Sequence, residues 1–212
     1  KKLDGSEIHD NVYTANVTLE PRVSRFEIYG FQYTQEGDVP KYTSVKLQKI
    51  ALNNYYTQSD FVSKLPVEDT KVFETIDHTE VWGWIEDRSA PWADELNLEL
   101  AVGGKKFVDG TDITDPAEDG EDAAGIITYG LAHVTDAAKN PELLLALRGV
   151  NSNSEVPLYL RGQFTNASAF TSGKIYRVLY SFTDSDFDEP ERCVELNVDV
   201  ADWTVVPVSP EF

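Results

Sequence analysis

Sulfur-containing residues are almost missing from this chain. Cys193 is the single cysteine among 212 residues, and there is no methionine. One cysteine excludes an internal disulfide and a cysteine-based metal site, so we expect packing to stabilise the fold and Cys193 to be a small buried hydrophobic residue. Because the chain does not begin at an initiator methionine, we expect an upstream segment to have been removed, as in a mature exported protein.

Positive charge is also scarce. Lysine and arginine number 18 against 37 aspartate and glutamate residues, which gives a net charge of -19 and a pI near 4.4. Such a surface repels phosphate backbones and anionic lipids, so we expect no nucleic-acid partner. No run of 18 apolar residues occurs, and membrane contact would therefore require a lipid anchor that lies outside this chain.

Patterns typical of enzyme and metal sites are missing too. His9, His78 and His133 show no metal-ligand spacing, and the chain contains no GxSxG, GxxxxGK[ST] or GxGxxG motif. We therefore expect no catalytic residue, no metal and no cofactor. A hydrolase that uses two carboxylates is a further hypothesis, which would require two acids at catalytic separation.

Two segments are rich in acid, residues 109–122 and 184–191. We expect both to be exposed loops, because runs of like charge are usually solvated. Calcium binding is the less favoured alternative, since oxygen ligands gather there. The EF-hand register fails: with Gly120 at the required glycine, Ala117 falls at a ligand position and Ile126 at the position of the bidentate glutamate.

What the chain does have is alternation of apolar and polar side chains, typical of strands with one buried face. The pattern is clearest over residues 194–200, which we expect to form one strand. Helical turns are expected only near residues 59–65 and 135–139. Strands separated by Gly, Pro, Asn and Asp clusters favour an all-β antiparallel sandwich. The other expected strands lie within residues 13–19, 26–28, 45–52, 81–85, 96–100, 126–131, 143–147, 156–160 and 176–182.

The tryptophans permit two interpretations. The rings of an exposed platform on which sugars stack could come from Trp82, Trp84, Trp92 and Trp203, with Tyr55 and Tyr56. Trp82 and Trp84 share one face of a strand, so both belong to the core if that face points inward. We favour core or interface packing over the glycan platform.

The C-terminal segment is the most informative part of the sequence. After Val200 the alternation of apolar and polar residues changes phase. Trp203 and Val205 fall in the phase that the polar residues Glu195 and Asp199 occupy earlier in the segment, and the change takes place at Asp202. Residues 203–212 are apolar and β-branched, and their two prolines suit a sheet edge. An apolar strand at an edge needs a cover or a partner. The alternative is an ordinary last strand that folds onto its own domain.

Residues 193–210, CVELNVDVADWTVVPVSP, resemble the C-terminal signature of the fimbrillin family of Bacteroidales, the subunits of type V pili. Residues 173–178, GKIYRV, resemble the strand that precedes this ending. Residues 17–28, 45–50 and 52–56 are similar to another stretch of the family. The matches spread from about residue 13 to residue 210.

This resemblance implies a transthyretin-like antiparallel β-sandwich with Greek-key type connections and at most short helices. Residues 1–10 would be a flexible leading segment, and residues 11–212 would be the sandwich region, chiefly a fimbrillin C-terminal domain. Two small sandwiches that divide near residues 105–123 are the alternative. Fimbrillins are exported through the outer membrane as lipoproteins, trimmed by a protease and polymerised by strand exchange.

The resemblance also implies a function. The chain would be a structural or adhesive subunit of cell-surface fimbriae, and its partners would be other fimbrial subunits, in a homo- or hetero-polymer, with host or bacterial surface ligands as a further class. The residues that it implies for strand exchange are Trp203, Val205, Val206 and Val208. The alternative function is a glycan-binding β-sandwich module displayed on the same surface.

Overall fold

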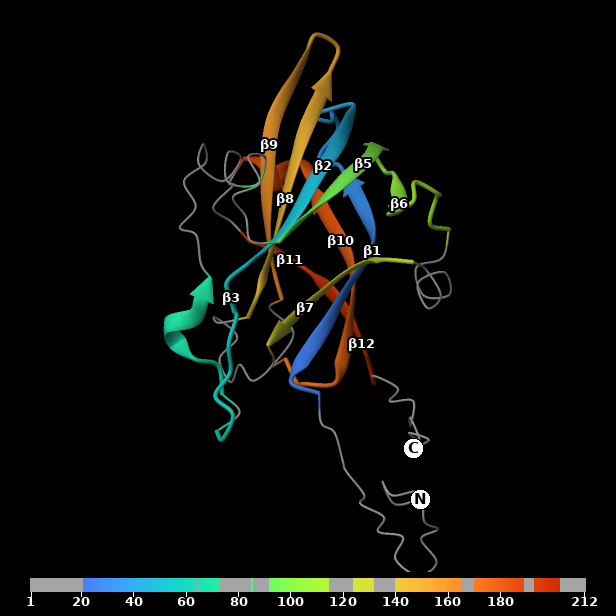
Figure 1. Cartoon of the computed structure of the whole chain (residues 1–212). Coiled ribbons are helices and arrows are strands. Elements are labelled where there is room, and N and C mark those ends of the chain that lie inside the picture. The colour runs from blue at the N-terminus through green and yellow to red at the C-terminus, as the bar shows by residue number, and fades with distance from the viewer. Residues whose placement is uncertain are drawn as a thin grey trace, which may run out of the picture.

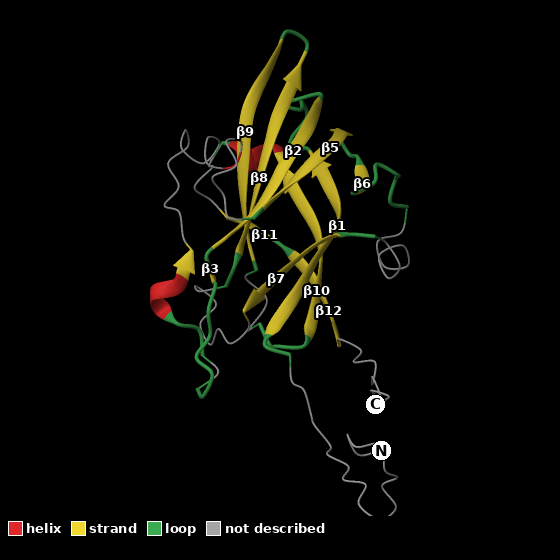
Figure 2. Cartoon of the chain, in the orientation of Figure 1, coloured by secondary structure: helices red, strands yellow, loops and turns green. Residues whose placement is uncertain are grey.

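The computed structural model describes residues 21–63, 65–72, 85, 92–114, 124–131, 140–164, 170–188 and 193–202. Nearly all regular structure in these residues is strand, and the helices η1 (Glu68–Thr70) and η3 (Asp184–Phe187) are short 3-10 turns (Figure 2). No helix in this part of the chain is long and apolar enough to cross a membrane. The strands are β1 (Val23–Thr34), β2 (Ser44–Asn53), β3 (Tyr55–Tyr56), β4 (Lys71–Val72), β5 (Ala93–Ala101), β6 (Lys105–Phe107), β7 (Ile126–Leu131), β8 (Glu142–Asn151), β9 (Ser154–Gln163), β10 (Lys174–Thr183), β11 (Cys193–Glu195) and β12 (Asn197–Asp202).

Within the described residues, the strands form two five-stranded sheets and the small β3–β4 pair (Figure 1). The β1 sheet has the order β12–β10–β1–β6, and β7 also pairs with β1. The β2 sheet has the order β11–β9–β8–β2–β5. One hydrophobic core draws side chains from both sheets, so the all-β sandwich predicted from the alternating pattern is confirmed.

The core is rich in aromatic rings because the inward positions of β1 and β10 carry them. Phe26 packs with its ring centroid 5.0 Å from that of Phe170 and 5.7 Å from that of Tyr176. The expected inward face of residues 176–182 is confirmed, since Tyr176, Val178, Tyr180 and Phe182 are all buried. In the opposite sheet Leu98 and Leu100 are buried as expected.

A register shift within β1 allows side chains from both halves of the strand to point into the same core. Phe26 and Ile28 are inward, and a register shift between Ile28 and Gly30 brings Phe31 and Tyr33 inward as well. A Cβ at Gly30 would lie 2.6 Å from Ile113 Cδ1 and 2.9 Å from the Lys106 carbonyl oxygen. Glycine is therefore required there for close packing.

Several details differ from the sequence-based expectation. Among the described strands, two pairs are parallel, β1 with β10 and β11 with β9, and the other pairs are antiparallel. At residues 59–65, where a short helical turn capped by Ser59 or Asp60 is expected, the described residues form a turn that a Ser59–Pro66 bridge closes, not a helix. The Asp60 carboxylate does accept the backbone N–H groups of Val62 and Ser63. The turn expected at residues 135–139 lies outside the described residues.

Strands from both halves of the chain share each sheet. β1 and β2 precede residues 105–123, and their partners β10 and β8 follow them. The described strands therefore do not separate into two units at residues 105–123. The expected leading segment, residues 1–10, and the expected strand at 13–19 lie outside the described residues. Of the strand expected at 81–85, only Ile85 is described, and it is buried but not assigned to a strand.

Candidate assembly surface

The chain crosses from one sheet to the other near its C-terminal end. β11 runs parallel to β9 in the β2 sheet, whereas β12 runs antiparallel to β10 in the β1 sheet. The single strand predicted over residues 194–200 is therefore wrong: the strand is divided at Leu196, which is fully buried and donates its N–H to the Gln163 carbonyl at 3.0 Å. Alternation continues through the crossing because both sheets face the same core.

β12 is the edge of the β1 sheet. It pairs with β10 from Leu179↔Asn197 to Lys174↔Asp202, and no described strand lies on its other side. Val198 packs against the core, while Val200 is 57 % exposed. An edge strand leaves alternate backbone N–H and C=O groups without a strand partner, so β12 can accept another strand.

Charge pairs hold β12 in register. Asp202 forms an ion pair with Lys174 on β10. On the outer face of the sheet, Asp199 of β12 lies opposite Arg177 of β10, which in turn lies opposite Glu27 of β1. Arg177 Nε is 3.3 Å from Glu27 Oε2. Opposite charges in adjacent cross-strand positions stabilise such a register.

Tyr29 lies close to Arg177 and is affected by the charges of Arg177 and Asp199. The Arg177 guanidinium carbon lies 5.7 Å from the centroid of the Tyr29 ring. Burial raises the pKa of the Tyr29 hydroxyl, the Asp199 carboxylate raises it further, and Arg177 lowers it. On the outer face of the β1 sheet, charged side chains thus link β12 to its neighbour β10 and, through Arg177, to β1.

The residues implied for strand exchange follow β12 directly. Trp203, Val205, Val206 and Val208 lie outside the described residues, as does the phase change expected after Val200; β12 ends at Asp202, the residue before Trp203. The last described strand before this segment, β12, is therefore an edge strand of the β1 sheet.

Of the three tryptophans considered for a glycan platform, only Trp92 lies in the described part of the chain; Trp82 and Trp84 fall outside it. Trp92 is partly buried and packs against the core. Its carbonyl accepts a hydrogen bond from the Leu52 N–H at 3.4 Å. Trp92 therefore contributes to packing against the core.

The other edges of the described sheets differ in how open they are. β5 carries exposed Asp94, Glu95 and Glu99, and the free part of β9 contains Pro157, so charge and a missing N–H oppose strand addition there. β6 is covered by its own turn, since Ile113 donates to the Lys105 carbonyl at 3.0 Å. β7 contains neither a charged residue nor a proline.

The described part of the acidic segment 184–191 is only partly the exposed loop that the sequence predicts: Asp188 is exposed, whereas Asp184 is not. Asp184 is only 6 % exposed; its carboxylate accepts hydrogen bonds from the Tyr33 hydroxyl and from the Lys41 N–H. Asp186 belongs to a capping box with Thr183 at the start of η3. The run of acids includes residues with specific donors, which the local charge pattern did not indicate.

In the other acidic segment, Asp109 accepts hydrogen bonds from the Thr111 N–H at 2.9 Å and the Thr111 hydroxyl at 2.7 Å. These bonds lower the pKa of the Asp109 carboxyl. Within the residues that the structure describes, no group of three His, Cys, Asp or Glu side chains could hold a metal ion. Residues 115–123 and the three histidines lie outside this range.

No family model and no curated protein matches the sequence. Among solved structures, the fold is similar to that of a proposed cell adhesion protein from Parabacteroides distasonis, with a TM-score of 0.53 and 13 % sequence identity over 90 % of this chain. At this identity the likeness shows the fold alone.

Two other solved structures align less closely. A proposed cell adhesion protein from Bacteroides eggerthii has a TM-score of 0.41 at 10 % identity over 87 % of this chain, and a fimbrial protein from Bacteroides vulgatus has 0.41 at 9 % over 86 %. This chain spans 54 to 56 % of the length of the three matched chains. It therefore corresponds to about half of each.

Proposed function

We propose that this chain is a non-enzymatic structural or adhesive subunit of cell-surface fimbriae. The observation that carries the proposal is the position of β12, an edge strand that ends at Asp202 and continues directly into the apolar residues 203–212. The likeness of the sandwich to that of the Parabacteroides distasonis protein supports the same class of function.

Assembly would proceed by strand donation, in which residues 203–212 of one subunit join a sheet of the next. Burial of Trp203, Val205, Val206 and Val208 would stabilise the contact by roughly 6 to 12 kcal/mol before the cost of ordering the segment. Backbone hydrogen bonds would fix the register, as in other strand-addition complexes. A head-to-tail contact does not close on itself and therefore builds a filament.

The partners would be other fimbrial subunits, displayed at the cell surface. The net charge of -19 makes two copies repel one another over distances beyond direct contact. Dissolved salt screens this repulsion with a Debye length of about 8 Å at physiological ionic strength. We therefore expect assembly of identical copies to become stronger as salt is added.

Electron microscopy of filaments shed from the source cells, labelled with an antibody against this chain, tests the proposal. Label at regular intervals along or at the ends of filaments is the expected result, and cells that lack the chain serve as the control. Antibody bound to cell bodies but never to filaments would contradict a fimbrial role.

A further inference from the structure

A loop beside β3 exposes large apolar side chains in an unusual concentration. We call residues 57–63 and 65–70 the apolar loop. Phe61 is 87 % exposed, Val62 86 % and Leu65 52 %. Contiguous exposed apolar groups on a soluble domain usually mark a contact with another molecule.

Hydrogen bonds build this loop independently of any partner. The Asp60 carboxylate accepts from the Val62 N–H at 3.1 Å and the Ser63 N–H at 2.6 Å, and the Asp60 N–H donates to the Leu65 carbonyl at 2.8 Å. Val67 N–H donates to the Gln58 carbonyl at 3.0 Å. Below them, Tyr56 is buried and its hydroxyl donates to Glu68 at 3.2 Å. Phe61 and Val62 are therefore held out in water by an ordered turn.

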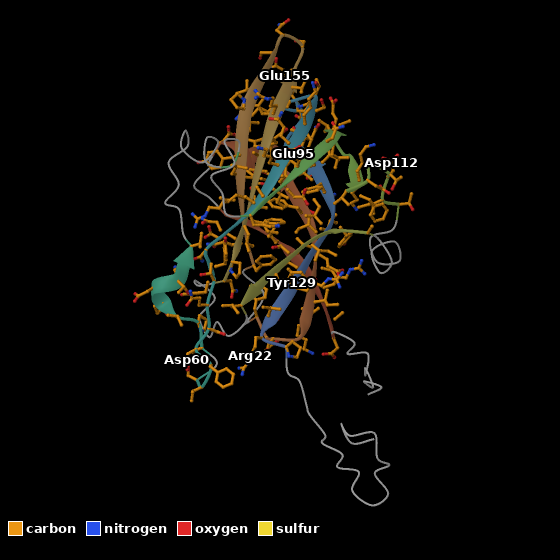
Figure 3. The ribbon with its side chains drawn as sticks, viewed as in Figure 1. Arg22, Asp60, Glu95, Asp112, Tyr129 and Glu155 are labelled. Atoms are coloured by element: carbon orange, nitrogen blue, oxygen red, sulfur yellow. The ribbon has the colours of Figure 1, made fainter. Side chains whose placement is uncertain are left out.

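The apolar loop lies at the end of the sandwich at which β12 ends. Figure 3 places Asp60 and Arg22 at one end and Glu155 at the other. Arg22 precedes β1, and Lys174 at the start of the adjacent β10 pairs with Asp202. The ten residues after Asp202 reach at most about 35 Å when extended. A subunit that takes this segment must therefore stand close to the end that carries the apolar loop.

The opposite end of the sandwich also carries exposed apolar side chains, those of two valines. Val39, 81 % exposed, precedes β2, whereas the apolar loop follows β2 and β3, so the two lie at opposite ends of this strand. Val156, 37 % exposed, pairs with Gly149, which is covered by Tyr42 of the segment before β2. Val39 and Val156 thus belong to the same end.

We propose that the apolar loop packs against the Val39 and Val156 end of a second copy of this chain, as a contact separate from strand donation. The inference rests on the proposed fimbrial function, because a filament requires unlike ends to meet. A contact of this kind would set the angle between successive subunits, which a donated strand joined through a flexible segment does not fix.

Cross-linking of full-length chains tests the contact, with Cys193→Ser as the background. Chains carrying Val62→Cys are mixed with chains carrying Val39→Cys, and disulfide-linked dimers are measured. The matched control replaces Val39→Cys by Asp112→Cys, since the Asp112 side chain is 78 % exposed and lies elsewhere. Dimers from the first mixture should exceed those from the control; equal yields, or no dimers, overturn the proposal.

Sedimentation velocity supplies the second measurement. The double variant Phe61→Ser, Val62→Ser should weaken association of the full chain by at least about tenfold. The control double variant Ile127→Ser, Tyr129→Ser replaces two side chains exposed on β7 and should not weaken association. Unchanged association of the loop variant overturns the proposal. So does loop-dependent flotation with phosphatidylcholine vesicles, since it would assign the loop to lipid.

The same cross-linking on chains that end at Asp202 separates the two proposals. Cross-links between positions 62 and 39 that persist without residues 203–212 support the loop contact. Filaments that also persist without these residues contradict strand donation but leave the loop contact supported. Filaments that form normally with Phe61→Ser and Val62→Ser contradict the loop contact alone.

Discussion

Leu196 lies directly against Gly162 at the point where the chain passes from the β2 sheet to the β1 sheet. A Cβ at Gly162 would stand 2.8 Å from Leu196 Cδ2 and 2.9 Å from the Tyr180 hydroxyl oxygen. The fully buried Leu196 side chain therefore fills the space that a glycine leaves open on β9. This contact positions β12 at the edge from which residues 203–212 continue.

Gly162→Ala is expected to destabilise the protein by about 1 to 3 kcal/mol, because the added methyl group overpacks the crossing. Leu196→Ala should cost about 2 to 5 kcal/mol through the cavity that it leaves. Urea unfolding measures both changes, with Val39→Ala as the exposed control. A neutral Gly162→Ala would show that the crossing can shift, contrary to the packing described.

The hydrogen bond from Tyr33 to the buried Asp184 predicts a loss of stability at alkaline pH. Burial raises the pKa of the Tyr33 hydroxyl above its ordinary value of 10.0, and the bond to Asp184 raises it further. A raised pKa means that this stability is complete below pH 10.0 and is lost as the pH rises through the folded-state pKa. Tyr33→Phe should reduce stability at neutral pH by about 1 to 3 kcal/mol.

Unfolding free energies measured in urea from neutral pH to about pH 11 test this. The alkaline decline should be shallower in the Tyr33→Phe variant than in the parent chain. An equally steep decline would assign the pH dependence to other groups, such as Tyr29 and Tyr55, whose pKa values burial also raises.

The sequence predicted which face of a strand points inward better than it predicted which strands and side chains hydrogen-bond to one another. The alternation at residues 176–182 identified four buried side chains because a strand places every second residue on one face. The same alternation at residues 194–200 could not reveal the crossing at Leu196, since hydrogen-bond partners leave no local signal. Burial of Asp184 depends on Tyr33, 151 residues away, so its acidic neighbours suggested only an exposed loop.

The ion pair of Glu142 on β8 with Arg161 on β9 lies beside β11, the strand that precedes the crossing. Glu142 is 1 % exposed and accepts from Arg161 Nε at 2.9 Å and Gln163 Nε2 at 2.8 Å. Arg161 also lies opposite Cys193 of β11. Arg161→Ala should destabilise the fold by about 3 to 5 kcal/mol, because it leaves a buried carboxylate without its charged partner.

Arg161→Lys is the matched variant for this prediction. It keeps the charge but loses the two-pronged geometry, so its loss of stability should fall between those of the parent and Arg161→Ala. Thermal unfolding by circular dichroism ranks the three proteins. A loss in Arg161→Lys equal to that in Arg161→Ala would indicate that geometry matters and charge does not.

The apolar loop should loosen in strong acid. Backbone donation from Ser63, with further bonds, lowers the pKa of the Asp60 carboxyl below 3.8. A lowered pKa means that the loop is fully stabilised above pH 3.8 and loosens as the pH falls through the folded-state pKa. Amide exchange at Val62 and Ser63, followed by NMR, should rise in Asp60→Ala at neutral pH, while exchange in the core remains slow. Unchanged exchange at both amides would contradict the role of Asp60.

Removal of residues 203–212 tests strand donation most directly. The chain that ends at Asp202 is compared with the full chain and with a full chain carrying Ser209→Ala, by electron microscopy and by sedimentation under conditions in which the full chain polymerises. Strand donation predicts that the shortened chain stays folded, shown by an unchanged β-sheet circular dichroism spectrum, and forms no polymer, whereas Ser209→Ala polymerises normally. Polymers of undiminished length from the chain that ends at Asp202 would contradict it.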